Sequence, residues 1–246
     1  MQLSSDQVFG FLLEKRVTHL HHANTVTTSC AFIQRKALFA RGCMEYFDFN
    51  QTAQKSDETD RQQGVYFDVF LDTVDIHTRA KARNAYGPVL FELSAKKLIE
   101  MNLPPLWITK SNPMNWTEKT TQQEKWFQNV DELRKDFVVG RFNQMIVLRH
   151  IGGILPLESC LDRVVLDDPQ MKTASHDTFT LSLGALVAAR ASANTPMSFK
   201  FRKRACSEGC NCLGEYQAKP KMTEEFFVPH RTKPAPIVSA VTAPRN

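Results

Sequence analysis

The stretch VTHLHHANTVTTSCAFIQRKALFARG, from Val17 to Gly42, decides the fold. Its first residues, Val17–His21, are short and β-branched at the start, which predicts a strand. Asn24 and the threonines after it provide N-caps for a helix that extends through Leu38 and stops near Gly42. The sequence therefore predicts a strand that leads directly into a helix.

Apolar runs and alternating patterns predict further short strands downstream, separated by helices and polar loops. These strands are predicted in the segments 65–71, 88–93, 142–150 and 161–169. Residues 3–16 carry apolar side chains at helical spacing, whereas the polar segment 51–63 is typical of a loop. Irregular alternation of short strands and helices favours an α+β fold with a mixed or antiparallel sheet over a regularly wound parallel sheet.

Composition changes after about residue 170, which suggests three parts. Residues 1–170 form the predicted core, and residues 171–216 form a C-terminal extension that carries a basic cysteine cluster. Within this extension, residues 175–194 predict a strand, a helix or one followed by the other. Residues 217–246 are rich in proline and lysine, which predicts an extended or disordered tail.

Charge and targeting signals indicate a cytoplasmic protein. The 246 residues include 31 Lys and Arg against 26 Asp and Glu, so the net charge is +5, which is compatible with an anionic partner. The N-terminus lacks the features of a signal peptide, and no apolar run approaches the roughly 20 residues needed to span a bilayer. Six cysteines without a secretion signal are typical of reduced thiols or metal ligands.

Three histidines crowd the first predicted strand. His19 and His21 share one face of a strand, and His22 lies on the other. Two imidazoles on one face can bind a metal, transfer protons or hydrogen-bond a ribose or phosphate. A third metal ligand at close spacing is missing, which argues against a zinc hydrolase, and solvated histidines at a polar strand end are the alternative.

The order of these motifs resembles the opening of DarT-type ADP-ribosyltransferases. His21-x-x-Asn24 follows the first strand and leads into a helix and KALFARG. Further on come an aromatic strand with downstream arginines, DVFLDTVDIHTRAKARN, a strand PVLFELS, and a last strand with Gln144 before MIV. The resemblance covers residues 15–170 and implies a split-sheet ADP-ribosyltransferase-like core.

The family resemblance also implies an activity. Such enzymes, which include relatives that modify messenger RNA, cleave the nicotinamide–ribose bond of NAD and transfer ADP-ribose. The implied substrate is RNA or single-stranded DNA. The implied setting is a toxin of a toxin–antitoxin or phage-defence system, with a protein antitoxin as partner.

The resemblance assigns residues to the NAD site. It implies that His21 and Asn24 face the cofactor, with His19 beside them. The family's arginine falls on Arg83 or Arg79. The residues assigned to the cofactor by the resemblance are His19, His21, Asn24, Arg79 and Tyr86.

The chain departs from the family pattern at the catalytic glutamate. The last strand carries Gln144 in its place, and a neutral amide can neither act as a base nor balance a cationic transition state by charge. Either the register differs, or another carboxylate such as Glu124 or Glu158 substitutes, or the enzyme is weak or inactive. The catalytic candidates are thus Arg83, Gln144 and Glu158, and an edge-strand amide is the alternative for Gln144.

Cys206, Cys210 and Cys212 form a C-x3-C-x-C cluster. Thiolates at this spacing can hold a structural zinc ion, although the common signature is two pairs of C-x2-C. The candidates for the fourth ligand are Cys160, His176 and His230.

Basic residues precede this cluster in FKFRKR. Arg202, Lys203 and Arg204, interleaved with phenylalanines, can contact a nucleic-acid backbone while the rings stack on bases. A solvated basic strand whose phenylalanines pack inward is the alternative. Two other functions remain open: a non-catalytic nucleic-acid-binding module built on the cysteines and FKFRKR, and a metal-dependent nuclease that uses the three histidines.

Two further groups have competing interpretations. Trp107, Trp116 and Trp126 could stack on a base, but tryptophans at this density more often anchor loops to a core. Asp68 and Asp72 lie on a predicted strand whose aspartates, with Asp75, do not all share one face. Metal catalysis by these aspartates is therefore not expected.

Overall fold

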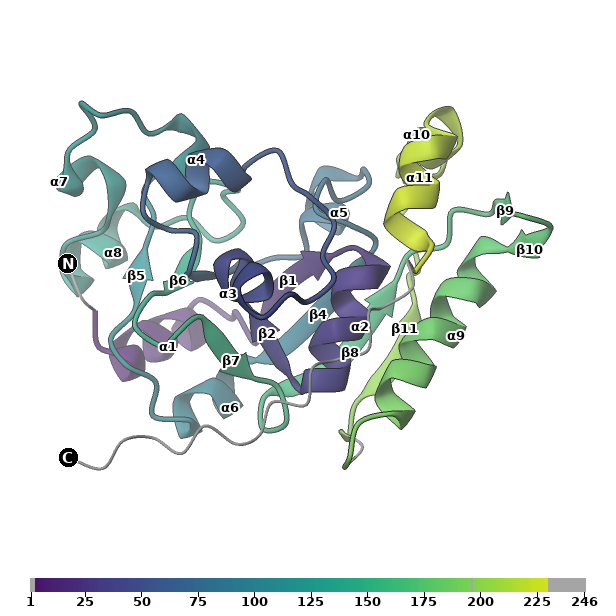
Figure 1. Ribbon diagram of the computed structural model, residues 1–246. Coiled ribbons are helices and arrows are strands. Elements are labelled where there is room, and N and C mark those ends of the chain that lie inside the picture. The colour runs from purple at the N-terminus through teal and green to yellow at the C-terminus, as the bar shows by residue number, and fades with distance from the viewer. Residues whose placement is uncertain (1–2, 196, 230–246) are drawn as a thin grey trace.

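The central sheet combines antiparallel and parallel strands in the computed structural model, which describes residues 3–195 and 197–229 (Figure 1). Its order is β1 (His19–Asn24), β4 (Val89–Ser94), β8 (Leu161–Leu166) and β11 (Lys200–Lys203). The first three strands pair antiparallel, and β11 adds to β8 in parallel. The predicted α+β class with a mixed sheet is confirmed.

A second sheet lies beside the first, in the order β3-β6-β5. Its strands β3 (Val69–Leu71), β6 (Ile146–Leu148) and β5 (Trp107–Ile108) pair antiparallel. The amide of His21 donates to the carbonyl of Asp72 at 2.9 Å, and the amide of Asp72 donates back at 2.8 Å. This reciprocal bridge joins the two sheets just after β3 ends.

Helix α2 (Val26–Arg35) ends earlier than the sequence suggested. Lys36 adopts the left-handed conformation with φ 57°, and the next residues form β2 (Ala37–Phe39), which pairs with β7 (Ile154–Pro156). Leu38 therefore lies in a strand. It is fully buried there, and its burial contributes on the order of 1.5–3 kcal/mol whichever element carries it.

Helices α2 and α9 (Thr178–Ala191) pack side by side beside the sheet, with α11 (Pro220–Phe227) next to them (Figure 1). Elsewhere α1 (Ser5–Glu14) packs against α6 (Ala95–Glu100) and α8 (Val130–Asp136). Shorter helices are α3 (Arg41–Tyr46), α4 (Asp57–Gln62), α5 (Ile76–Ala80), α7 (Gln122–Lys125) and α10 (Cys212–Ala218). The remaining elements are the 3-10 helix Pro113–Asn115 and the hairpin of β9 (Lys172–Thr173) and β10 (His176–Asp177). Among the described residues, no helix has the length and apolar character needed to cross a membrane.

The C-terminal segments differ from the expected extended tail. Helix α11 lies within the stretch from residue 217 that its proline and lysine content marked as extended or disordered. It forms because Phe227 is buried against the ring of Tyr216, with centroids 5.2 Å apart, and Thr223 Oγ1 donates to the Tyr216 carbonyl. Residues 230–246 of the expected tail lie outside the described residues.

Trp116 and Trp126 anchor loops to a small apolar cluster, and Trp107 packs against them from β5. Trp126 lies 5.1 Å from Trp107 and 5.0 Å from Trp116 between ring centroids, in edge-to-face contacts. The guanidinium of Arg149 stacks over Trp107 and Trp126. Trp126 is not helical, because it ends the turn of α7 and bridges Thr109.

Candidate functional site

A pocket of about 800 Å³, counted out to its mouth, opens where the two sheets meet. Segments far apart in the sequence form its wall: the end of β1, the start of α3, the strand β3 and the loops around Tyr86 and Asn112. Polar side chains at this wall include His22, Asn24, Arg41, Asp68, Asp72 and Tyr86. The pocket thus combines imidazole, amide, guanidinium, carboxylate and phenol groups.

Strand β1 supplies His22 and Asn24 to the pocket, because residues two apart share a face of a strand. His22 Nδ1 donates to the carbonyl of Phe70 at 2.9 Å, so its Nε2 carries a lone pair. Burial lowers the pKa of His22, which keeps the ring neutral. Its Nε2 has no hydrogen-bond partner among the described residues, so it can accept a hydrogen bond from a ligand.

Asn24 is held in place at the N-terminal end of α2. Its side-chain oxygen accepts from the amide of Thr25 at 2.9 Å, and the residue is only 3% exposed. Gly87 packs directly on this turn, and a Cβ there would lie 2.2 Å from the carbonyl carbon of Asn24. A glycine with φ 144° is therefore required to bring Tyr86 to the rim of the pocket beside Asn24.

Arg41 is the cation at the pocket wall. Its Nε and one terminal nitrogen form a fork with both oxygens of Asp57, at 2.9 and 2.8 Å, and the same terminal nitrogen donates to the carbonyl of Thr52. The other terminal nitrogen is buried and lacks a partner among the described residues. A guanidinium fixed on one edge and unpaired on the other suits an anionic ligand such as a pyrophosphate.

Three aspartates line the pocket, Asp60, Asp68 and Asp72, and burial raises the pKa of Asp68 and of Asp72 to about 7. For Asp68 the nearby Arg149 guanidinium, 3.1 Å away, opposes this shift without forming an aligned hydrogen bond. For Asp72 burial is the only cause of the shift, with no opposing charge or hydrogen bond from the described part of the chain. The Asp72 carboxylate is therefore the group most ready to meet a positive charge from a ligand.

Tyr86 completes this side of the pocket. Burial and the neighbouring Asp72 carboxylate raise the pKa of the Tyr86 phenol. The phenol therefore stays protonated at neutral pH and can donate a hydrogen bond.

Of the residues that the resemblance assigned to NAD, Asn24 and Tyr86 line the pocket. His19 bonds Asp162 at 3.0 Å instead, and His21 lies on the opposite face of β1 from Asn24. Arg79 is exposed on α5, while Arg83 pairs with Glu215 at 3.4 Å. The histidine and the arginine that line the pocket are therefore His22 and Arg41, whereas the resemblance assigned these roles to His21 and to Arg79 or Arg83.

The candidate catalytic carboxylate positions lie elsewhere. Gln144 is buried, and its amide accepts from Val138 N at 2.7 Å and donates to the carbonyl of Asp136 at 3.3 Å, so it closes the turn before β6. Glu158 pairs with Lys36 at 2.8 Å, and Glu124 forms the capping box of α7. None of these three side chains lines the pocket.

Three residues of the pocket, His22, Arg41 and Asp72, were not singled out from the sequence as cofactor or catalytic residues. In a strand, His22 shares a face with Asn24, because the two residues are two apart. Arg41 belongs to the KALFARG motif, and Asp72 comes directly after the alternating strand. Their convergence could not be deduced, because it depends on how two separate sheets meet.

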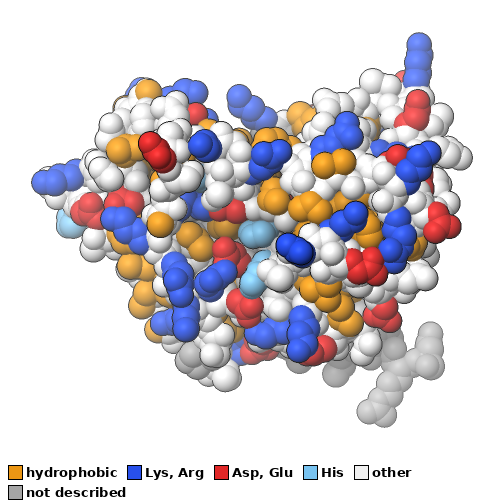
Figure 2. Space-filling view, turned by 180° about the vertical axis from the view of Figure 1, so that it is seen from behind, with side chains coloured by type: hydrophobic (Ala, Val, Ile, Leu, Met, Phe, Trp, Pro, Cys, Tyr) orange, Lys and Arg blue, Asp and Glu red, His pale blue; other side chains and the backbone are white. Residues whose placement is uncertain are grey.

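The basic run before the cysteines is divided between surface and interior. Arg202 is exposed, Lys203 pairs with Asp168, and Arg204 is buried between Asp75 and Asp167. Phe199 and Phe201 contact each other and the Arg190 guanidinium. Figure 2 shows Lys and Arg side chains scattered over one face among acidic ones, without a single basic stripe.

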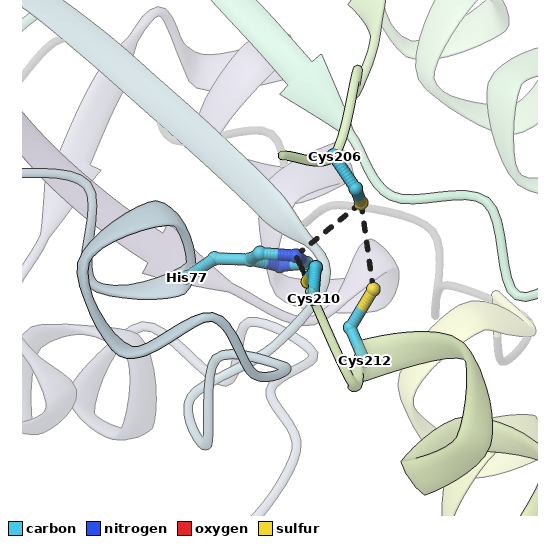
Figure 3. A group of neighbouring side chains, drawn as sticks. All are labelled: His77, Cys206, Cys210 and Cys212. Atoms are coloured by element: carbon cyan, nitrogen blue, oxygen red, sulfur yellow. Dashed lines mark hydrogen bonds between the residues drawn. The ribbon is translucent and has the colours of Figure 1, made fainter. Parts of the chain in front are cut away.

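The three cysteines meet a histidine that the sequence did not single out. His77, from α5, joins Cys206, Cys210 and Cys212 with all four ligand atoms within 4.8 Å of one another (Figure 3). Cys160 instead bonds the carbonyl of Pro156, and His176 bonds that of Ala174. His230 lies outside the described residues. Three thiols and an imidazole are donors that can bind zinc.

Comparisons with known proteins find similarity in structure rather than in sequence. No family model matches the chain, and no curated protein sequence matches it. The fold is similar to that of DarT from Thermus sp. 2.9 in complex with ADP-ribosylated single-stranded DNA. That match has a TM-score of 0.48 and 9% identity, over 77% of this chain and 95% of the other. The structure of the same Thermus protein in complex with NAD+ gives a TM-score of 0.45 and 10% identity, over 76% and 95% of the two chains.

Proposed function

We propose that the chain is an NAD-dependent ADP-ribosyltransferase that modifies a nucleobase in RNA or single-stranded DNA. One observation carries the proposal: the unpaired terminal nitrogen of Arg41, the Asp72 carboxylate and Asn24 line the same pocket. These groups match the anionic pyrophosphate, the cationic nicotinamide–ribose end and the polar hydroxyl or carboxamide groups of NAD. The motif order of the sequence, which resembles DarT-type enzymes, supports the same cofactor.

The reaction places definite demands on such a site. The bond between ribose C1′ and the nicotinamide nitrogen breaks, its electron pair neutralises the pyridinium, and positive charge develops on the ribose. A nucleobase nitrogen then bonds to C1′ and loses a proton. Stabilising the intermediate charge requires a carboxylate held in place near the ribose, and holding NAD requires a cation at the pyrophosphate.

Asp72 is the carboxylate we assign to that charge. The positively charged nicotinamide ring favours the ionised carboxylate, so NAD binding is expected to lower the pKa of Asp72 below about 7. In this role Asp72 supplies the charge that an amide at Gln144 lacks. Asn24 and the neutral His22 would hold the ribose hydroxyls or the carboxamide.

The acceptor and the biological setting extend this proposal. The net charge of +5 and the exposed Arg202 favour an anionic acceptor such as a nucleic acid. We infer a cytoplasmic toxin of a toxin–antitoxin or phage-defence system, silenced by a protein antitoxin.

Transfer of label from NAD tests the activity. NAD labelled in its ADP-ribose part is incubated separately with RNA, single-stranded DNA and protein, using wild type, Asp72→Asn and the matched surface variant Asp131→Asn. We expect label on a nucleic acid with wild type and Asp131→Asn, and near-complete loss with Asp72→Asn. Folded wild-type protein that labels none of the acceptors would overturn the proposal.

A further inference from the structure

We propose that the chain binds one structural zinc ion through the thiolates of Cys206, Cys210 and Cys212 and through Nε2 of His77 (Figure 3). Cys206 and Cys210 come from the segment between β11 and α10, and Cys212 is the first residue of α10, whereas His77 belongs to α5 and lies 129 residues before Cys206. The ion would join these two parts of the chain. This inference does not depend on the proposed enzymatic activity.

Three distances between ligand atoms match those around a tetrahedral ion, and all four atoms lie within 4.8 Å of one another. His77 Nε2 lies 3.6 Å from Cys206 Sγ and 3.4 Å from Cys210 Sγ, and the Sγ atoms of Cys206 and Cys212 are 3.5 Å apart. Zn–S bonds of about 2.3 Å and Zn–N bonds of about 2.0–2.1 Å at tetrahedral angles give ligand separations of about 3.5–3.8 Å. A disulfide would need the sulfurs about 2.05 Å apart, so Cys206 and Cys212 are not bonded to each other.

The imidazole is oriented as zinc-binding histidines usually are. His77 Nδ1 donates to Asp167 at 2.8 Å, which leaves the Nε2 lone pair facing the sulfurs. Asp167 also accepts from Tyr216 Oη at 2.6 Å and from Arg204. His77 and Asp167 are each 1% exposed, so the aspartate that fixes the ring is itself held from three sides.

A cation lies close to the proposed ion site. A Zn²⁺ ion with three thiolates and a neutral imidazole carries a net charge of −1. The Arg204 side chain, 7% exposed, lies next to the cluster, where it bridges Asp167 and Asp75. Its positive charge offsets part of the negative charge of the ion site and these two aspartates.

The cysteine segment is shaped and docked for this contact. Gly209 adopts φ 74° in the turn between the first two cysteines, and the Cys210 amide donates to the carbonyl of Ser207. The segment then reaches Lys81, just after α5, which accepts from Asn211 N at 2.8 Å and donates to the Glu208 carbonyl at 3.1 Å. Hydrogen bonds and ligand geometry thus bring the same two segments together.

Four protein ligands leave no open coordination position, which indicates a structural rather than a catalytic ion. None of the four residues lines the pocket described above. However, His77 follows Asp72 by five residues on the same segment. The ion would therefore fix the C-terminal residues 204–216 against the segment that carries the pocket carboxylate.

Metal analysis of the full chain tests the proposal. We expect about one zinc per chain by mass spectrometry, and X-ray absorption at the zinc edge should show three sulfur ligands and one nitrogen ligand. Wild-type protein without stoichiometric zinc that also fails to withdraw zinc from a colorimetric chelator would overturn the site. Four sulfur ligands, or two, would overturn the assigned ligand set.

Variants test the individual ligands. Cys210→Ser and His77→Gln should each weaken zinc affinity by at least about 10–100-fold, measured by chelator competition with circular dichroism as a folding check. Cys160→Ser and His176→Gln, which alter residues outside the cluster, should keep wild-type affinity. Unchanged affinity in His77→Gln, or a loss in His176→Gln that equals the loss in Cys210→Ser, would contradict the assignment of His77. X-ray absorption on the wild-type chain decides the ligands if a variant does not fold.

Discussion

The pocket and the cysteine–histidine cluster gather residues from distant segments in opposite ways. In the pocket, one terminal nitrogen of Arg41 and Nε2 of His22 have no protein partner among the described residues, and the carboxylate of Asp72 lines the same wall. In the cluster, the side chains converge on one another, and their supporting groups Asp167, Arg204 and Tyr216 are all bonded. Unpaired polar groups along a wall indicate a site for an organic ligand, whereas converging donors indicate a site for an ion.

The largest effect expected at the pocket is that of Asp72→Asn. Removing the negative charge while keeping the shape should lower the rate of ADP-ribose transfer by about 100–1000-fold, as for other groups that stabilise transition-state charge. NAD affinity should change far less. Single-turnover transfer and NAD binding by calorimetry separate the two quantities, and a rate within twofold of wild type would remove Asp72 from the mechanism.

Arg41→Ala should act on binding rather than on chemistry. Loss of the guanidinium that faces the pocket is expected to raise the Kd for NAD by about 10–100-fold, the cost of a charge-assisted hydrogen bond of 1.5–3 kcal/mol. Arg134→Ala, which removes an exposed arginine paired with Glu14, is the control. If Arg79→Ala or Arg83→Ala weakens NAD binding and Arg41→Ala does not, the family arginine lies on the later segment.

The pH dependence of stability distinguishes Asp72 from an ordinary surface aspartate. Its folded-state pKa of about 7 lies above the ordinary aspartate value of 3.8, so between these two pH values the folded state binds the extra proton. This contribution to stability is fully present below about pH 4 and is lost as the pH rises to about 7. We therefore expect the unfolding free energy of wild type to fall relative to Asp72→Asn over this range. Denaturant titrations at several pH values measure the unfolding free energy of both proteins. If it changes with pH equally in wild type and Asp72→Asn, the raised pKa is contradicted.

Tyr86→Phe should give the smallest change. It removes one phenol donor at the rim and keeps the ring, so the expected loss is about 0.5–1.5 kcal/mol, or roughly 2- to 10-fold in kcat/KM. Gly87→Ala should cost more than Tyr86→Phe, because its Cβ would collide with the Asn24 backbone. If Gly87→Ala is as active as wild type, Tyr86 and Asn24 need not be adjacent for activity.

Local patterns predicted much of the fold correctly and the site less completely. The helix after Asn24, the strand around Leu90 and the strand around Val164 form where periodicity placed them. The helix through Leu38 was wrong, because Lys36 turns left-handed and the chain pairs with β7, a contact more than a hundred residues away. The apolar pattern of a sequence indicates which residues are buried, but a short apolar run is buried equally well in a helix and in a strand.

The sequence by itself determined the α+β class, the placement of Asn24 at the end of a strand, and the set of three cysteines. It did not determine which partners these residues meet. The reciprocal bridge between His21 and Asp72 brings the two sheets together, and the docking of residues 204–216 brings His77 to the cysteines. Both depend on long-range packing, since strand alternation and ligand spacing constrain only neighbours in the chain. Tertiary structure therefore decided which carboxylate faces the pocket and which fourth ligand completes the proposed zinc site.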